Sequence, residues 1–360
     1  MGDKYIFNSK PDWEAFIACL RHKGTPKRVH LIELLMDAEI QDAICQEFNL
    51  LDGLNQDDLY FNEKKLLRIQ RFLGYDYVNP NVEGLEFPLY RTSTEDTAIF
   101  RRDGGRSYVN ESRGPITNWD EFEKYPWPDP NKISTRSLEW FEQNLPDDMC
   151  VLSWGVAHFA EYISWLMGYE TMCFALYEQR ELVEAISNRL LEIFTVVIKQ
   201  ILDFSRVKVI FGSDDMGFKN GTLISPKDLR EFVLPGHKIM AELTHQTGRL
   251  YILHSCGNLA RIMNDLINDI RIDGKHSFED TIEDVRDVKL SYGQQIAILG
   301  GIDMDFLCRS RPEEIRKRVS DTLEICQQGG GYCLGTGNTV ANYIPLENYL
   351  TMLDEGHRWR

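Results

Sequence analysis

The chain contains the sequence Arg249-Leu-Tyr-Ile-Leu-His254-Ser-Cys256-Gly257, which joins an apolar run to a short polar cluster. Residues 250–253 have the length and apolar character of a buried strand. Because side chains alternate along a strand, His254 and Cys256 point the same way at its carboxyl end. An imidazole and a thiol placed together there are typical of a pair of metal ligands, although core histidines and buried cysteines are also common.

The size and charge of the chain limit the functions that it can have. With 360 residues it can bury a large core, and 43% hydrophobic and 27% charged residues are ordinary values for a globular protein. The net charge of −16 argues against nucleic acids and anionic membranes as partners. The eight cysteines lack the spacing of a disulfide framework, and no membrane span or signal peptide is recognisable. We therefore expect a soluble, cytoplasmic protein with reduced thiols.

Strand and helix patterns alternate beyond residue 150. Six short apolar runs predict strands, and amphipathic helices are predicted between most of them. This alternation predicts an α/β protein with a parallel sheet, and the polar or glycine-rich cluster after each run predicts a (β/α)8 TIM barrel whose site lies at the carboxyl ends of the strands. The predicted strands are residues 151–154, 207–211, 250–253, 270–273, 296–299 and 332–334.

The first part of the chain differs from this pattern. Residues 1–75 are predicted to form an N-terminal helical extension, and residues 76–360 a single barrel. Residues 75–78 predict a first strand, residues 97–109 a hairpin, and the proline-rich segment 119–130 an ordered loop. No GxGxxG or GxxxxGK[ST] motif follows a predicted strand, which argues against a nucleotide-binding fold.

Polar side chains at the predicted strand ends are candidates for catalysis. Asp214 and Asp215 follow one strand, and because neighbouring side chains alternate in direction, at most one of them faces the pocket. A helix cap or a turn is the alternative role for these carboxylates. His276 and Asp303 could bind substrate, orient a metal ligand or transfer a proton. We predict Asp214, His276 and Asp303 as catalytic residues.

A catalytic zinc ion would need a third protein ligand besides His254 and Cys256. Zinc accepts imidazole and thiolate, and a catalytic site leaves one position open for substrate. Cys333 on the last predicted strand is the best candidate because thiolate suits zinc, although it could equally be a core residue. Trp154 ends another predicted strand and His158 comes after it, and we predict that they bind substrate, with a packing role as the alternative.

Four motifs of the chain are informative together. They are Ile224-Ser-Pro226-Lys-Asp-Leu-Arg-Glu-Phe-Val-Leu-Pro235, Leu253-His254-Ser-Cys256-Gly-Asn258, Gly300-Gly-Ile-Asp303, and Pro345-Leu-Glu347-Asn348 with Met352. With these motifs the sequence resembles the uroporphyrinogen decarboxylase superfamily over nearly its whole length. The resemblance implies a (β/α)8 barrel but does not choose the reaction.

Two branches of this superfamily compete. True decarboxylases carry an Arg-Gln-Ala-Gly-Arg element that grips substrate carboxylates, and the corresponding region here, Lys27-Arg-Val-His-Leu-Ile-Glu-Leu-Leu35, lacks it. In the cobamide-dependent methyltransferases a His-x-Cys pair, matched here by His254 and Cys256, binds zinc with a later Cys. Counted back from the Pro-Leu-Glu-Asn motif, that later Cys falls nearer Asn338 than Cys333. The third ligand thus stays open between Cys333, Asn338 and an acidic residue. We predict Cys333 as the ligand and Asn338 as a substrate-binding residue.

The resemblance implies a zinc-dependent methyltransferase that moves a methyl group between a small molecule and a corrinoid (cobamide) carried by a partner protein. Segments 29–37 and 335–338 look most like the subgroup that demethylates methoxylated aromatics. Two alternatives come from other classes of function. A metal-free decarboxylase would need a basic pocket, built from residues such as Arg101, Arg102 or Arg106, and a non-catalytic binding protein would keep the barrel without activity.

Overall fold

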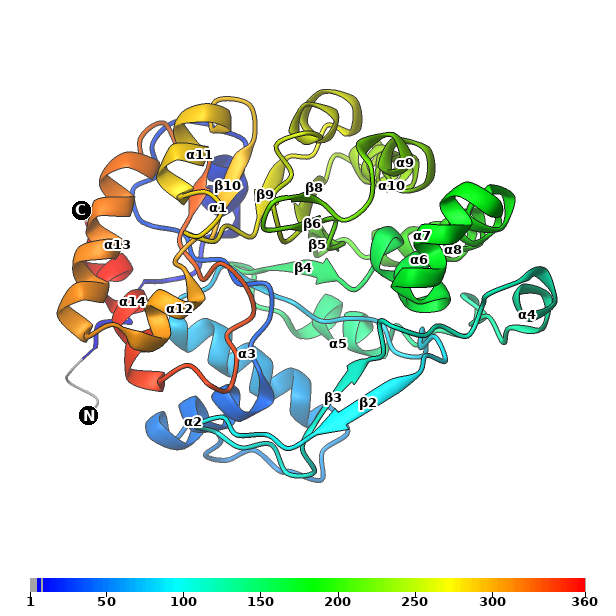
Figure 1. Ribbon diagram of the computed structural model, residues 1–360. Helices are drawn as coiled ribbons and strands as arrows, with labels where there is room; N and C mark the ends of the chain where they lie inside the picture. Colours follow the sequence, from blue (N-terminus) through cyan, green and yellow to red (C-terminus); the bar gives the residue numbers. More distant parts are fainter. Residues whose placement is uncertain (1–4, 8, 360) are drawn as a thin grey trace.

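The protein is built around one curled parallel sheet with helices on its outside. The computed structural model describes residues 5–7 and 9–359, and Figure 1 shows the sheet in the middle of the molecule. Among the described residues, seven parallel strands lie side by side in the order β1-β4-β5-β8-β9-β10-β11. They are β1 (Tyr77–Val78), β4 (Cys150–Trp154), β5 (Val207–Ser213), β8 (Leu250–His254), β9 (Gly274–His276), β10 (Ala297–Leu299) and β11 (Tyr332–Cys333).

Residues 29–36 lie between the last strand and the first. Leu31 pairs with Leu334 in parallel orientation, just beyond β11. On the other side, the Glu33 N–H donates to the hydroxyl of Tyr77 in β1 at 2.9 Å. This segment therefore occupies the eighth position of the barrel, although it comes from the predicted helical extension. The barrel is confirmed, while the division of the chain at residue 75 stays a prediction.

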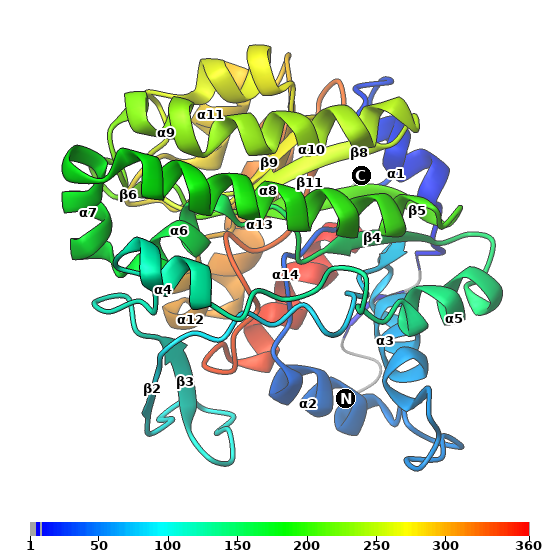
Figure 2. The ribbon, with the colours of Figure 1, turned by 90° about the vertical axis from the view of Figure 1, so that its right-hand side faces the viewer.

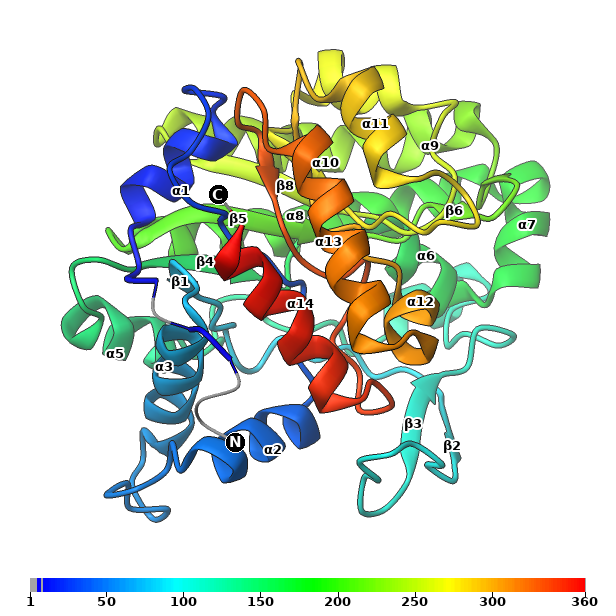
Figure 3. The ribbon, with the colours of Figure 1, turned by 90° about the vertical axis from the view of Figure 1, so that its left-hand side faces the viewer.

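The helices cover the sheet on opposite sides. In Figure 2, α8 (Arg180–Leu202) and α10 (Leu234–Gln246) lie side by side in front of the strands. In Figure 3, α13 (Pro312–Cys326) and α14 (Leu346–Arg358) cross the opposite side. No helix in the described part of the chain is long and apolar enough to cross a membrane. The other helices are α1 (Trp13–Leu20), α2 (Ala38–Phe48), α3 (Phe61–Leu73), α4 (Trp119–Lys124), α5 (Arg136–Asn144), α6 (Phe159–Met167), α7 (Tyr169–Glu178), α9 (Pro226–Phe232), α11 (Val285–Tyr292) and α12 (Met304–Arg309).

One strand begins later than the sequence predicts. The apolar run at 270–273 was expected to form a strand, but β9 begins at Gly274. Residues Asp265–Ile270 instead form a π-helix, and the chain turns at Arg271, whose φ of 64° is left-handed. The isoleucines of the run are buried in both arrangements, so apolar character alone does not place the boundary.

Two features between β1 and β4 differ from their predictions. The hairpin pairs β2 (Arg91–Thr94) with β3 (Arg106–Val109), so its first strand lies before the predicted segment. The segment predicted as a loop contains α4, because the Asn118 side chain accepts a hydrogen bond from the Glu121 N–H and caps the first turn.

A further short hairpin, after β5, joins β6 (Gly217–Phe218) to β7 (Gly221–Thr222).

The close approach of Gly335 to residues 29–36 provides a test of the barrel's closure. A β-carbon at Gly335 would lie 1.7 Å from the Ile32 carbonyl oxygen, so the backbone would have to move. We expect Gly335→Ala to lower the free energy of unfolding in urea by roughly 2 kcal/mol or more, as overpacking does. Gly53→Ala is the control, because a β-carbon there meets nothing within 4 Å and costs only backbone strain of about 1 kcal/mol. Equal small losses in both variants would contradict the closure.

Candidate metal centre

The strands carry polar side chains to one edge of the barrel. Because the strands are parallel, their carboxyl ends lie at the same edge. His254 ends β8 and His276 ends β9, and the register of these strands pairs the two residues directly. Asp215 follows β5, and Thr336 follows β11. The structure therefore gathers side chains from distant parts of the chain at this edge.

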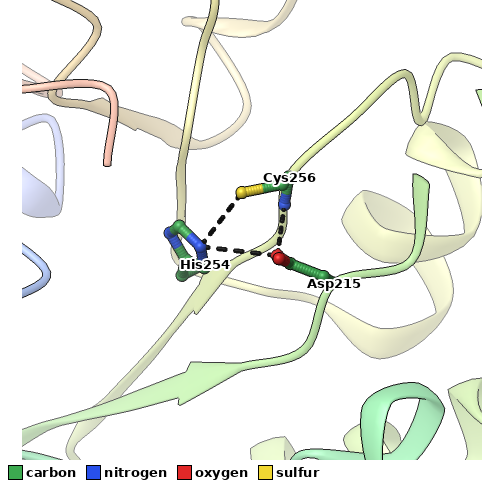
Figure 4. A group of neighbouring side chains, drawn as sticks. All are labelled: Asp215, His254 and Cys256. Atoms are coloured by element: carbon green, nitrogen blue, oxygen red, sulfur yellow. Dashed lines mark hydrogen bonds and ion pairs between the residues drawn. The ribbon is translucent and has the colours of Figure 1, made fainter. Parts of the chain in front are cut away.

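Asp215, His254 and Cys256 form a compact group of possible metal ligands (Figure 4). His254 Nε2 lies 3.4 Å from Cys256 Sγ and 3.4 Å from Asp215 Oδ1. The three donor atoms all lie within 4.8 Å of one another. The Cys256 N–H also donates to Asp215 Oδ1 at 2.8 Å, which holds the carboxylate beside the thiol. The pair chosen from the sequence thus gains an acidic neighbour.

Hydrogen bonds determine which nitrogen of His254 is available to a metal. His276 Nε2 lies 3.1 Å from the Thr336 carbonyl oxygen, which can only accept, so this nitrogen carries a proton. Burial, with the charges of His254 and Lys275, holds the pKa of His276 well below its ordinary value, so the ring is neutral and its Nδ1 is bare. That Nδ1 accepts from His254 Nδ1 at 2.8 Å. His254 therefore presents Nε2 to Cys256 and Asp215.

Two side chains donate hydrogen bonds to the Cys256 sulfur. Asn338 Nδ2 lies 3.2 Å and Ser277 Oγ 3.4 Å from Sγ. Burial and the Asp215 carboxylate raise the pKa of Cys256 well above its ordinary value. Burial also opposes ionisation of Asp215, but the hydrogen bond and charge of His254 outweigh it and lower the pKa of Asp215 to about 2. A positive ion at this point would favour the thiolate that the two donors can support.

The donor set fits zinc. Ligand atoms bound at about 2.0–2.3 Å around a tetrahedral ion lie roughly 3.5 Å apart, close to the two separations of 3.4 Å measured from His254 Nε2. Nitrogen, sulfur and oxygen are all ligands that zinc accepts, and three protein ligands leave a fourth position for substrate. The residues present therefore suit the metal that the family resemblance implies.

A buried turn, residues 335–338, supports this group through Glu33. The Thr336 hydroxyl contacts a Glu33 carboxyl oxygen and lies 2.5 Å from the Asn338 carbonyl oxygen. The Thr336 N–H donates to both Glu33 carboxyl oxygens, at 3.2 and 3.1 Å, and the Thr336 hydroxyl can donate its one proton to Glu33 or to the Asn338 carbonyl oxygen. Burial raises the pKa of Glu33 to about 8, which agrees with a protonated acid at neutral pH. Glu33 thus holds the turn as a neutral group.

Asp214 points into the protein, away from the donor group. Its carboxylate accepts the N–H groups of Ala160 and Glu161, both at 2.9 Å, and lies 2.9 Å from His237 Nε2. Asp214 is fully buried and satisfies the first turn of α6. Of the two adjacent carboxylates, only Asp215 joins the group of possible ligands. The contacts of Asp214 are those of the helix cap that the sequence allowed as its alternative role.

Cys333 lies in the core. Its side chain is fully buried, it shares a hydrogen bond with the thiol of Cys19 in α1, and burial raises its pKa well above the ordinary value. Within the described residues, the group of possible ligands contains Asp215 and not Cys333. The physical reason is that the Cys333 side chain contacts Cys19 of α1, whereas the ligand candidates lie at a strand end or just beyond one.

The other predicted site residues have partners of their own. Asp303 accepts the Phe306 N–H at 3.0 Å and caps α12. His158 Nδ1 lies 2.7 Å from a Glu161 carboxylate oxygen. Burial opposes protonation of His158, but the hydrogen bond and charge of Glu161 outweigh burial and raise its pKa. The catalytic role of Asp303 and the substrate-binding role of His158 stay predictions.

Two cavities lie near the predicted site residues. One, of about 390 Å³, adjoins the donor group and is lined by Asp215, with Trp165, Tyr169 and Phe218 among its walls. Another, of about 430 Å³, is lined by Trp154 and by none of the three candidate ligands. The Trp154 indole N–H donates to the carbonyl oxygen of Asn79, just after β1, at 3.0 Å. Trp154 therefore faces a cavity separate from the donor group.

Some supporting residues escaped selection from the sequence. Asp215 was considered only as the neighbour of Asp214, and Glu33 only as part of a similar segment. Lys275 is buried in β9, where it donates to the Ser277 carbonyl oxygen at 2.8 Å, and burial lowers its pKa to about 8. A charged residue inside an apolar run is the signal that would have identified Glu33. Lys275 has no such signal, because polar residues and a glycine surround it.

Residues 107–359 match a known protein family, described as uroporphyrinogen decarboxylase (URO-D). The match extends from β3 through α14 and includes the candidate metal centre. The chain belongs to the uroporphyrinogen decarboxylase family. The family indicated by the four sequence motifs is thereby confirmed.

Two similar proteins are both named as methyltransferases. A methylated-thiol–coenzyme M methyltransferase of Methanosarcina mazei is 30% identical over 130 residues, which cover 36% of this chain and 32% of that protein. The aligned part thus spans about one third of that relative's length. A solved structure of a methyltransferase from Methanosarcina mazei has a TM-score of 0.68 at 15% identity and covers 97% of this chain and 99% of its own. This likeness establishes a shared fold.

Substitution of each adjacent aspartate separates structural support from ligand binding. The amide of Asp214→Asn cannot accept from both Ala160 and Glu161, so we expect a loss of roughly 1–3 kcal/mol in the free energy of unfolding, measured in urea. Asp215→Asn is the matched control: its side chain is 43% exposed, and its stability should change by less than about 1 kcal/mol. The same loss in both variants would argue against distinct roles.

The protonated Glu33 makes stability depend on pH. In the folded protein Glu33 keeps its proton up to about pH 8, whereas an unfolded glutamate ionises near about pH 4.3. Between these values the folded state binds one more proton, so the free energy of unfolding falls as pH rises, by up to about 1.4 kcal/mol per pH unit, and this contribution levels off above the folded pKa. Glu33→Gln should flatten that fall in urea unfolding curves. An unchanged slope would show that Glu33 is ionised.

Proposed function

We propose that the protein is a zinc-dependent methyltransferase that moves a methyl group between a small molecule and a corrinoid carried by a partner protein. The observation that carries this proposal is the convergence of His254 Nε2, Cys256 Sγ and an Asp215 oxygen at the carboxyl edge of the barrel. The family and the names of the similar proteins support methyl transfer as the use of such a centre.

The three donors would hold zinc, with Asp215 in the place that the sequence gave to Cys333. When bound, zinc supplies Lewis acidity toward an ether oxygen or lowers the pKa of a thiol acceptor. His276 keeps His254 in the tautomer that leaves Nε2 free. Both ring nitrogens of His276 are engaged in this way, so it acts as a positioning residue. Asn338 donates to the ligand sulfur and would temper its charge.

The cavity of about 390 Å³ beside Asp215 would take the small-molecule substrate. Trp165, Tyr169 and Phe218 give it aromatic walls, which suit a methoxylated aromatic. Phe218 is 52% exposed, so the cavity continues to the protein surface. A corrinoid held by another protein would then have a route to the methyl group, and the phenolate that leaves would take its proton from water.

A decarboxylase of polycarboxylates is the alternative within the family. Such a substrate needs cationic side chains that are not already neutralised. Arg101, Arg102 and Arg106, which the sequence offered for a basic pocket, each form an ion pair with a carboxylate of the protein. Their positive charges are therefore already paired within the protein, which favours methyl transfer over decarboxylation of a polycarboxylate.

Metal content and methyl transfer together test the proposal. Protein purified with zinc should carry about one ion per chain, because the three donors form one site. We expect Cys256→Ala and Asp215→Ala to lose the metal, measured by elemental analysis. Cys333→Ala is the matched control and should retain it, because its thiol lies in the core. Loss of zinc in Cys333→Ala but not in Asp215→Ala would restore Cys333 as the third ligand.

Activity is followed with a soluble corrinoid as acceptor. Zinc-loaded protein should convert cob(I)alamin and an aryl methyl ether to methylcobalamin and a phenol, seen in the visible spectrum of the corrinoid. Cys256→Ala should be inactive while its circular dichroism is unchanged. Decarboxylation of a porphyrinogen-like polycarboxylate by metal-free protein, with no corrinoid turnover, would overturn the proposal.

A further inference from the structure

The cavity beside Asp215 has a further carboxyl group on one of its walls. Glu161 lines this cavity together with Ser164 and Trp165, which follow it in α6. Residues three and four positions apart share one face of a helix, so this face of α6 is turned toward the cavity. The Glu161 side chain is 16% exposed, which leaves it accessible to a molecule in the cavity.

The first turn of α6 places Glu161 beside the candidate metal centre. Its N–H donates to Asp214 Oδ1 at 2.9 Å. Asp215 is the next residue of the chain, lines the same cavity and belongs to the group of possible metal ligands. A substrate in this cavity is therefore bordered by Glu161 from α6 and by the donor group from the strand ends.

His158 is the partner of the Glu161 carboxyl group. It directly precedes α6, and its Nδ1 atom lies 2.7 Å from Glu161 Oε2. Burial raises the pKa of Glu161, although the hydrogen bond and charge of His158 oppose this effect. Burial lowers the pKa of His158, but the hydrogen bond and charge of Glu161 outweigh burial and raise it. Both shifts favour a pair that keeps a proton at neutral pH.

The other carboxyl groups that line this cavity have different surroundings. Asp215 is a candidate metal ligand with a pKa of about 2. Glu111 and Glu170 also line the cavity, but they are exposed to solvent. Among the described residues of this wall, Glu161 is the carboxyl group that is both largely buried and paired with an imidazole. Such a pair is suited to general acid catalysis.

We propose that Glu161 is a catalytic residue that protonates the departing phenolate oxygen, and that His158 is a positioning residue that returns a proton to Glu161. The inference rests on the proposed function. The electron pair of Co(I) in the corrinoid forms the new bond to the methyl carbon, and the pair of the broken O–CH3 bond stays on the phenolate oxygen. That oxygen takes the proton of Glu161. His158 then passes its Nδ1 proton to Glu161 and gains one from water at its other ring nitrogen.

Two aryl methyl ethers of similar size test this role. The phenol released from para-cyanoanisole is a stronger acid than that from para-methylanisole, so its phenolate leaves more readily without a proton. Glu161→Gln keeps the size of the side chain but removes the acid. With cob(I)alamin as acceptor, we expect it to lower kcat by roughly 100-fold or more for para-methylanisole and by less than about tenfold for para-cyanoanisole. Because both ethers are compared in one preparation, partial unfolding would not alter this ratio.

Glu170→Gln is the matched control, because it removes an exposed carboxyl group from the same wall. It should change both rates by the same factor. His158→Gln should show the selective loss of Glu161→Gln more weakly, because water can still reprotonate Glu161. All three variants should carry as much zinc as the wild type, measured by elemental analysis, because neither Glu161 nor His158 belongs to the donor group.

The outcomes separate this inference from the proposed function. Turnover of both ethers by the wild type, with an equal loss for both in Glu161→Gln, would overturn proton donation and leave methyl transfer intact. Loss of zinc in Glu161→Gln would make Glu161 a metal ligand and overturn it as well. Wild-type protein that turns over neither ether would contradict the proposed function, and the proton-donor role would fall with it.

Discussion

One hydrogen bond, between His276 Nε2 and the carbonyl oxygen of Thr336, determines the chemistry that the site can offer. Because a carbonyl oxygen never donates, it assigns the proton of His276, and through His276 the proton of His254. The outcome is that His254 donates from Nδ1 to His276 and directs Nε2 at Cys256 and Asp215. A single main-chain acceptor thus orients two imidazole rings. The same turn positions Asn338 against the sulfur, so both members of the His-x-Cys pair depend on its place in the barrel.

The turn is held by hydrogen bonds from Thr336 to Glu33 and from Asn338 to Cys256. Glu33 and Thr336 are 303 residues apart in the sequence, yet they meet where the barrel closes. An ionised carboxylate at this depth would be costly, and burial raises the pKa of Glu33 to about 8, so the acid stays neutral while its oxygens accept from Thr336. Residues 29–36 therefore have two functions in the fold: they complete the sheet, and they support the turn beneath the candidate metal centre.

Much of the barrel could be predicted because its strands are buried on both faces and appear as apolar runs. The segment 29–36 at the eighth position escaped prediction because His30 and Glu33 interrupt its apolar pattern, and their partners, such as Asp76 for His30 Nδ1, come from distant parts of the chain. The position of β9 was missed because Ile270 is buried at the end of a π-helix and Ile272 just after it, although neither is in a strand. Strand alternation correctly limited Asp214 and Asp215 to one pocket-facing residue, but it could not choose between them. That choice depends on α6, whose free N–H groups attract Asp214.

By itself, the sequence determined the family, the α/β barrel and the placing of His254 with Cys256, because these follow from local periodicity and from short motifs. Only the tertiary structure decided that Asp215 joins this pair, that Cys333 packs against Cys19, and that Glu33 is protonated. Each of these depends on distances between residues far apart in the chain and on burial, which changes the free energy of a charge. Neither quantity can be read from the order of the residues. In the candidate metal centre, His254 and Cys256 come from a local motif, whereas Asp215 and Asn338 join them only in the folded barrel.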